Sequence, residues 1–183
     1  MSDKKRDGEV ITLGSGDVMI KEFTGAMPAY TDFTEKDLIG RISGGAELEY
    51  KGTFHEAKDD TGRVRKTIIT DEEVTFKSGV MTWNGKTLQK LVSTARAEDK
   101  NGIRTVKIGG LSNYNGKSYA ICFHHTDHID VDVWIVIRGT AKGGFKMAFA
   151  KDKETVVDAE FSALPSDDEG TLITFVEEIG LSA

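Results

Sequence analysis

The feature that most constrains the fold is a strict alternation between positions 46 and 55. Ala46, Leu48, Tyr50, Gly52 and Phe54 alternate with Glu47, Glu49, Lys51, Thr53 and His55. A period of two predicts a half-buried β-strand. The segment KTIITDEEVTFKSGVMTW (66–83) is rich in Thr, Val, Ile and Phe, which predicts a return strand. We therefore expect a long hairpin over 46–83, turning at DDTG, with a polar and charged tip at 56–66.

One α-helix is expected after this hairpin. In NGKTLQKLVSTARAEDKNG (84–102), Leu88, Leu91, Val92 and Ala95 fall at i, i+3, i+4 and i+7, on one helical face. Asn84 can cap the start, and Asn101-Gly102 is expected to end the segment.

The rest of the chain predicts short strands joined by polar turns. The candidates are IRTVKIGGL, KSYAICFHH, DVDVWIVIRGTA, GGFKMAFAK, ETVVDAEFSAL and GTLITFVEEI. Short strands with a turn about every ten residues favour a β-sandwich or barrel. The length of 183 residues favours a single domain, over 17–183, preceded by a flexible arm at 1–16.

Charge and composition exclude several classes of protein. The net charge is -6, with acidic and basic residues interspersed, which argues against a protein that grips nucleic acid. The single cysteine, Cys122, excludes an internal disulfide framework. No apolar run is long enough for a membrane span, and no apolar segment follows the charged start as in a secretory signal. We expect a protein made in the cytoplasm.

HHTDH (124–128) raises the question of a metal site. Imidazole and carboxylate groups bind zinc and other divalent ions. His124 and His125 are neighbours on a strand end, so their side chains point to opposite faces. His125 and His128 could approach across the turn, with Asp127 or Asp130 as a third ligand. A solvated turn between two strands is the simpler interpretation.

Other catalytic patterns also have simple structural explanations. Cys122 stands close to His124 and His125, but Ala120, Cys122 and His124 share one parity of a strand, which favours a buried apolar cysteine. The carboxylate runs at 71–73 and 167–169 resemble the acid pairs of glycosidases. They fall in a strand and a turn, where solvated charge is the ordinary interpretation. No residue pattern requires an enzyme.

The order of segments resembles the major tail protein, or tail tube protein, of long-tailed bacteriophages. The resemblance rests on SGGAELEYKGTFHEAKDDTG, on TIITDEEVTFKSGVMTWNGKTLQKLVSTA and on FAKDKETVVDAEFSALPSDDEGTL. It covers roughly residues 38–180. Its two most specific parts are the charged hairpin followed by one helix and the closing phrase at 157–172. Neither part carries catalytic residues.

This resemblance implies a mainly β protein: a β-sandwich with one flanking helix and a long hairpin. Six copies would form a ring, and stacked rings would form a tube lined by a closed β-barrel, with about four strands from each subunit. The expected partners are further copies of the chain, a tape measure protein and tube-end components. Genomic DNA would pass through without specific binding. The resemblance implies a virion location, no cofactor and no membrane.

Two surfaces are expected to matter in such a tube. The hairpin tip would contact the next ring through charged residues: Lys58, Asp59, Asp60, Arg63, Arg65 and Lys66. Glu154, Asp158 and Glu160 share one strand parity and are expected to line the lumen, with Phe145, Met147 and Phe149 of a facing strand in the core. Alternatively, this acidic face is the outer wall. The alternative function is a soluble β-sandwich binding module or a small metal-dependent enzyme using the turn from His124 to His128.

Overall fold

A computed structural model describes residues 16–61, 63, 65–126, 132–142, 144, 145, 147, 149, 151, 152 and 154–178. The expected arm at 1–16 lies outside this range except for Gly16. In chain order the elements are β1 (Asp17–Glu22), η1 (Tyr30–Asp32), η2 (Glu35–Asp37), β2 (Ile42–Lys58), β3 (Arg65–Val80), α1 (Gly85–Leu91), β4 (Arg96–Lys100), β5 (Ile103–Lys107), η3 (Leu111–Asn113), β6 (Tyr119–His125), β7 (Val133–Ala141), β8 (Val157–Leu164) and β9 (Thr174–Glu177).

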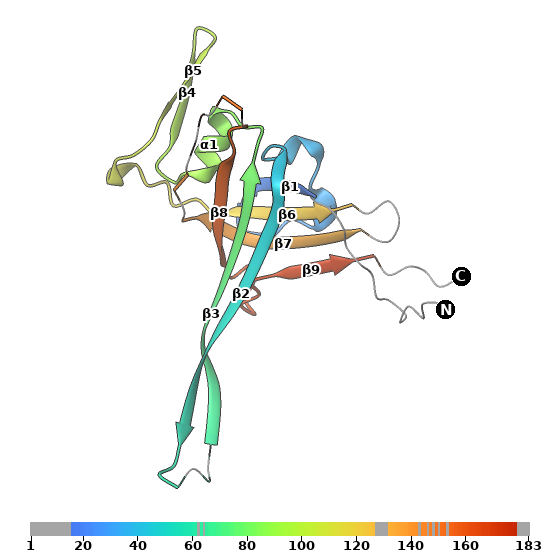
Figure 1. Cartoon of the computed structure of the whole chain (residues 1–183), viewed down its shortest axis with the longest axis vertical. Helices are drawn as coiled ribbons and strands as arrows, with labels where there is room; N and C mark the ends of the chain where they lie inside the picture. The colour runs from blue at the N-terminus through green and yellow to red at the C-terminus, as the bar shows by residue number, and fades with distance from the viewer. Residues whose placement is uncertain are drawn as a thin grey trace, which may run out of the picture.

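The main sheet is antiparallel and divides at β7. Its strand order is β1-β6-β7-β8-β3-β2, and β9 also pairs with β7. Residues 133–136 of β7 pair with β9, whereas residues 138–141 pair with β8. One edge of β7 therefore serves two strands, and β8, β3 and β2 run steeply across β1, β6, β7 and β9 (Figure 1). The expected mainly β fold is confirmed, but its two layers are halves of one bent sheet.

The main core lies between these two halves and is closed by α1. Its largest fully buried side chains include Phe76 of β3, Phe161 of β8 and Ile121 of β6. Ile20 of β1 and Ile137 of β7 belong to the same cluster. A smaller cluster with Cys122 and Phe33 lies apart from it. Alternate residues of β6 therefore enter different clusters, as the period of a strand requires.

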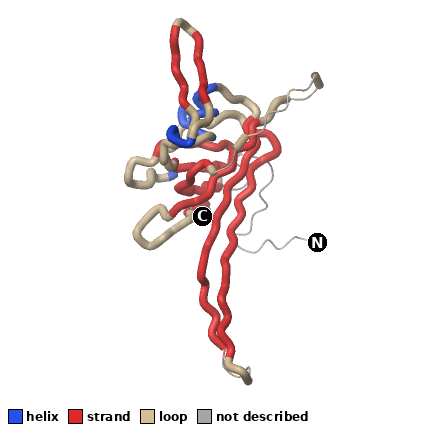
Figure 2. The backbone as a smooth tube through the Cα atoms, turned by 90° about the vertical axis from the view of Figure 1, so that its left-hand side faces the viewer, coloured by secondary structure: helices blue, strands red, loops and turns tan. Residues whose placement is uncertain are grey.

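The long hairpin is confirmed, and its paired strands continue into the expected polar tip. The β2–β3 ladder runs from Ile42 opposite Val80 to Lys58 opposite Arg65, and it projects from the body as an arm (Figure 2). Residues 65–73 of β3 are all exposed. Within the expected polar and charged tip at 56–66, backbone pairing continues as far as Lys58 opposite Arg65. Backbone hydrogen bonds in a ladder do not require apolar side chains.

The single α-helix of the described chain is shorter than expected. Asn84 caps it by accepting hydrogen bonds from the backbone N–H groups of Lys86 and Thr87, as predicted. Leu88 and Leu91 are buried, but the chain is already extended at Val92. Residues 96–107 form the β4–β5 hairpin instead of further helix.

The Asn101-Gly102 pair explains why a hairpin forms where further helix was expected. Both residues have positive φ, 52° and 75°. That geometry is typical of a type I′ hairpin turn, for which Asn-Gly is the strongest short signal. The pair therefore turns a hairpin and does not end a helix.

One expected strand is absent from the described residues. Among residues 142–152, those that the structure describes belong to no strand. Phe145 and Met147 pack against the main core as expected, but Phe149 is 79% exposed. Phe149 is therefore not a core residue.

Candidate functional site

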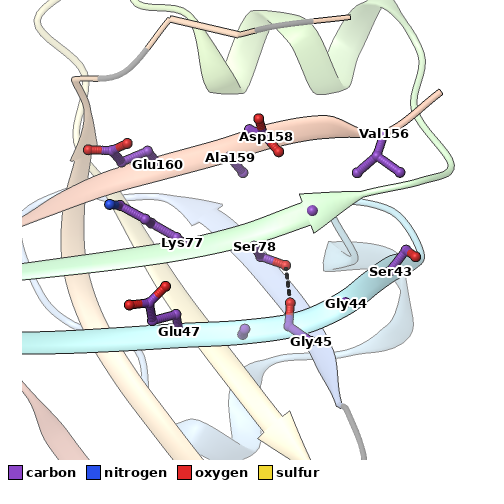
Figure 3. Close-up of a pocket in the computed structure, with 12 residues that line it drawn as sticks. Ser43, Gly44, Gly45, Glu47, Lys77, Ser78, Val156, Asp158, Ala159 and Glu160 are labelled. Atoms are coloured by element: carbon purple, nitrogen blue, oxygen red, sulfur yellow. Dashed lines mark hydrogen bonds between the residues drawn. The ribbon is translucent and has the colours of Figure 1, made fainter. Parts of the chain in front are cut away.

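The most distinctive surface is the exposed face of β2, β3 and β8. Residues that lie directly opposite one another in an antiparallel ladder point to the same side of the sheet. Lys77 of β3 lies opposite Glu47 of β2 on one side and Glu160 of β8 on the other. These three side chains form a row across the strands (Figure 3). The core residues Phe76 and Phe161 point to the opposite side.

We call this surface the acidic face. Between the two bulges of the β2–β3 ladder and on β8, its charged residues are Glu47, Glu49, Lys51, Asp71, Glu73, Lys77, Asp158 and Glu160. Carboxylates outnumber lysines by six to two, and each of these residues is exposed. The Nζ of Lys51 lies 3.0 Å from Glu49 Oε1. The face therefore keeps a net negative charge at neutral pH.

A pair of glycines opens a hollow in this face. Gly44 and Gly45 have φ of 82° and 80°, and the β2–β3 register shifts there. Side-chain-bearing residues rarely adopt such φ values, so the SGGA sequence is what permits the bulge. Ser78 Oγ donates a hydrogen bond to Gly45 O at 3.3 Å. The hollow has a volume of about 380 Å³ and is also lined by Asp158 and Glu160.

The sequence-predicted lumen residues fall on two sides of a strand boundary. Asp158 and Glu160 are exposed and belong to the acidic face, while Val157, Ala159 and Phe161 between them are buried. Glu154 is exposed but precedes β8, so no ladder places it on this face. Whether the face lines a lumen stays a prediction.

Sequence reasoning missed the contributions of β2 and β3 to this face. Asp71 and Glu73 point to it, whereas Glu72 points away and accepts a hydrogen bond from Tyr50 Oη at 2.6 Å. This bond raises the pKa of Tyr50. The alternation of residues in β2 and β3 indicates which side chains of each strand share a side. Only the register between the two strands shows that these side chains lie on one common face. The carboxylates of the run at 71–73 therefore divide between the two sides of the arm.

The residues of the expected inter-ring tip lie at the end of the arm. Glu56 lies within ion-pair distance of Lys58, at 3.2 Å, and of Arg65, at 3.7 Å. Lys66 lies opposite Ala57 in the ladder. The Asp59 carboxylate accepts a hydrogen bond from the Thr61 hydroxyl. Asp60 and Arg63 are exposed. Their proposed contact with a second ring stays a prediction.

The two described histidines of the 124–128 turn do not converge. His124 Nε2 lies 2.9 Å from Asp132 Oδ2, and its ring stacks on Trp134 with centroids 4.7 Å apart. His125 is buried, and adjacent strand residues face opposite ways. Asp127, His128 and Asp130 lie outside the described residues. Within the described chain, no group of three or more His, Cys, Asp or Glu side chains is placed to hold a metal ion.

Cys122 lacks the environment of a nucleophile. Its side chain is fully buried in the smaller cluster. Burial raises the pKa of this thiol to about 12, because the thiolate would lose its hydration. A reactive cysteine needs an accessible thiolate. The buried apolar role expected from its strand parity is therefore correct.

The carboxylates at 167–169 organise a turn. Asp167 Oδ1 accepts hydrogen bonds from the backbone N–H groups of Glu169, at 3.1 Å, and Thr171, at 2.9 Å. The hydroxyl and backbone groups of Thr171 are the first causes that lower the pKa of Asp167. This geometry is an Asx-type turn with exposed carboxylates.

Comparison with known proteins gives little further information. No family model matches the chain, and no curated protein matches it. Among solved structures, the chain is similar to one from the virion of a native gene transfer agent (GTA) particle. The two share 7% sequence identity with a TM-score of 0.43, over 87% of this chain and 95% of that chain.

Within the described residues, no helix has both the length and the apolar character that a bilayer span requires.

Proposed function

We propose that this chain is a structural virion protein, the tail tube protein of a long-tailed phage. Six copies would form a ring, and rings would stack into a tube through which the genome leaves the particle. The observation that carries the proposal is the acidic face, a charged surface on three strands that is backed by the packed core where β3 pairs with β8. Such a surface suits the wall of a channel for DNA.

The charge of this face supports the proposed channel role. DNA carries a dense row of phosphates, and clustered Lys and Arg side chains would bind it. A wall where carboxylates prevail repels phosphate and lets the polymer pass. Lys51 and Lys77 stand among carboxylates, Lys77 directly between Glu47 and Glu160, so neither offers phosphate an isolated positive charge.

The free edge of β2 supports assembly into rings. β2 has 17 residues and ends the sheet, with β3 as its paired neighbour. A long unpaired edge invites pairing with another chain unless it is protected. Pairing between copies around a closed ring would use this edge and continue the acidic face from one subunit to the next. The projecting arm would then reach toward an adjacent ring.

Electron microscopy of negatively stained protein at high concentration tests this proposal. We expect rings of uniform diameter or tubes with an axial channel, and class averages that give the number of subunits. Monodisperse monomers at every concentration would refute it.

A further inference from the structure

The segment 108–114 presents apolar side chains to solvent beyond α1. Leu111 is 96% exposed, Tyr114 is 62% exposed and Ile108 is 44% exposed. Isolated exposed apolar residues are common on protein surfaces, but three within seven residues form a patch. We call this segment the knob.

Hydrogen bonds hold the knob in one conformation. Gly109 N donates to Thr94 Oγ1 at 3.2 Å, and Asn113 Nδ2 donates to Gly109 O at 2.9 Å. Asn115 N donates to Ser93 O at 2.9 Å. Gly110 has φ 86°, and a Cβ there would meet Asn113 Nδ2 at 2.4 Å, so glycine is required. The exposure of Leu111 is therefore built into the loop, and a partner would bind it without first ordering it.

An apolar pocket of suitable size lies elsewhere on the chain. It has a volume of about 230 Å³, and its lining includes Met27, Pro28, Tyr30, Val136, Thr174 and Val176. Pockets for small-molecule ligands usually span roughly 300–1,000 Å³, so this one is better matched to a side chain. In Figure 1 the knob, in olive, lies at the left, whereas β9 and the blue segment after β1 lie at the right. A copy therefore cannot fill its own pocket.

The charges beside the two surfaces are complementary. Arg96 and Lys107 lie directly opposite each other at the base of the knob, and no carboxylate in the described chain is within ion-pair distance of either. Like charges placed opposite each other destabilise a ladder. The turn at 167–169 contributes Asp167 to the pocket and carries exposed Asp168 and Glu169. An intermolecular contact would bring these opposite charges together.

From these observations we infer that the knob of one copy docks into the apolar pocket of a second copy. The contact joins two different surfaces, so it repeats from copy to copy and closes into a ring when the rotation permits. Leu111 and Tyr114 fill the pocket, while Arg96 and Lys107 approach the acidic turn. This inference rests on the proposed ring assembly and names one of the contacts that forms it.

Leu111→Asp is the first test, measured by sedimentation velocity and negative stain. A buried apolar anchor of an interface contributes enough that its loss should weaken self-association on the order of 30-fold or more. Leu111→Met, which keeps an apolar side chain, is the matched control and should assemble as the wild type does. Because Leu111 is 96% exposed, both variants should melt at the wild-type temperature. Wild-type assembly by Leu111→Asp would overturn the inference.

Mixing two defective variants tests whether the knob and the pocket contact each other. Ala29→Arg fills the pocket and places a positive charge facing Arg96 and Lys107. Each variant alone should stay monomeric. An equimolar mixture with Leu111→Asp retains one intact knob and one intact pocket, so it should form heterodimers and no rings. Monomers in that mixture would show that the two surfaces are not partners.

Exchanging the charges at Lys107 and Asp168 separates an effect on the contact between copies from an effect on folding. Lys107→Glu removes a like-charge pair with Arg96, so the monomer should be at least as stable, while assembly should weaken. Adding Asp168→Lys to the same chain should restore assembly. Wild-type assembly by the single Lys107→Glu variant would contradict the contact.

The outcomes distinguish the knob contact from the tube proposal. If rings persist without the knob, the contact is wrong and the tube proposal stands. If association depends on the knob but gives only dimers, the tube proposal is wrong.

Discussion

Phe54 and Ile69 lie directly opposite each other across the β2–β3 arm, yet they are 64% and 46% exposed. Their side of the arm continues the side that carries Phe76 in the core. A bulge between Thr53 and Phe54 keeps this pair on that side although the parity of β3 changes. The body does not cover this part of the arm, and in the proposed tube a second copy would cover it.

Replacing Phe54 and Ile69 together by Thr should separate folding from assembly. Threonine keeps the preference for a strand and removes apolar area that is already exposed. We expect the melting temperature of the monomer to change by no more than a few degrees, while tube elongation slows strongly when followed by light scattering. Val74→Thr, at a fully buried position of β3, is the control and should instead lower the melting temperature. Unchanged elongation by the double variant would exclude the arm face from assembly.

The charged end of the arm should be needed for ring stacking. Replacing residues 57–65 with a short Gly-Ser turn removes Lys58 and Arg65 and shortens the ladder only in its outer part, which contributes no buried core residue. The monomer should stay folded by circular dichroism, and microscopy should show rings without long tubes. Tubes that grow at the wild-type rate would contradict this role.

Leu91→Ala should destabilise the fold by about 2–5 kcal/mol, as substitutions of large core side chains by alanine do. Leu91 is 3% exposed and packs in the main core, where α1 closes the gap between the halves of the sheet. Thermal and urea unfolding measure the change. Lys86→Ala on the exposed side of α1 is the control and should have little effect. No loss with Leu91→Ala would mean that α1 does not close the core in solution.

Asp158→Lys with Glu160→Lys should change DNA passage more than assembly. Both side chains are exposed on the acidic face, and placing a like charge opposite Lys77 should cost no more than about 1 kcal/mol. Tubes should still form and should bind DNA, and virions should eject DNA slowly, with effects that weaken as salt rises. The control is Asp152→Lys with Glu178→Lys, which makes the same change in net charge outside the acidic face. Normal ejection by virions with the first pair would place the acidic face on the outer wall.

The buried thiol of Cys122 should make the free energy of unfolding fall at alkaline pH. Burial raises the pKa of its thiol from 9.0 to about 12, so between these values the unfolded chain releases a proton that the folded chain keeps. The wild-type free energy of unfolding should therefore fall with rising pH from about 9 toward 12, by up to about 1.4 kcal/mol per pH unit. Cys122→Ala lacks this group, so its stability should approach that of the wild type as pH rises. Parallel urea titrations of both proteins check the trend; a constant difference would show that the thiol titrates normally in the folded state.

Local sequence determined much of this protein because some interactions depend only on near neighbours. Alternating polarity defined the β2–β3 hairpin, Asn84 capped α1, and the parity of Val157, Ala159 and Phe161 marked the buried side of β8. Asn101-Gly102 was the instructive error: the same pair can end a helix or turn a hairpin. The choice depended on Val92, where the backbone is already extended.

Tertiary structure decided what local pattern could not, because a strand's partners lie far away in the sequence. The acidic face exists only because the register sets Glu47 and Glu160 on either side of Lys77, and no periodicity within one strand contains that information. The division of β7 between β8 and β9 bends the sheet and leaves the arm outside the body. The knob and its pocket come from segments that are distant in sequence and separated in space. Their relation depends on the shape of the folded surface, which the alternation of residues along one strand does not specify.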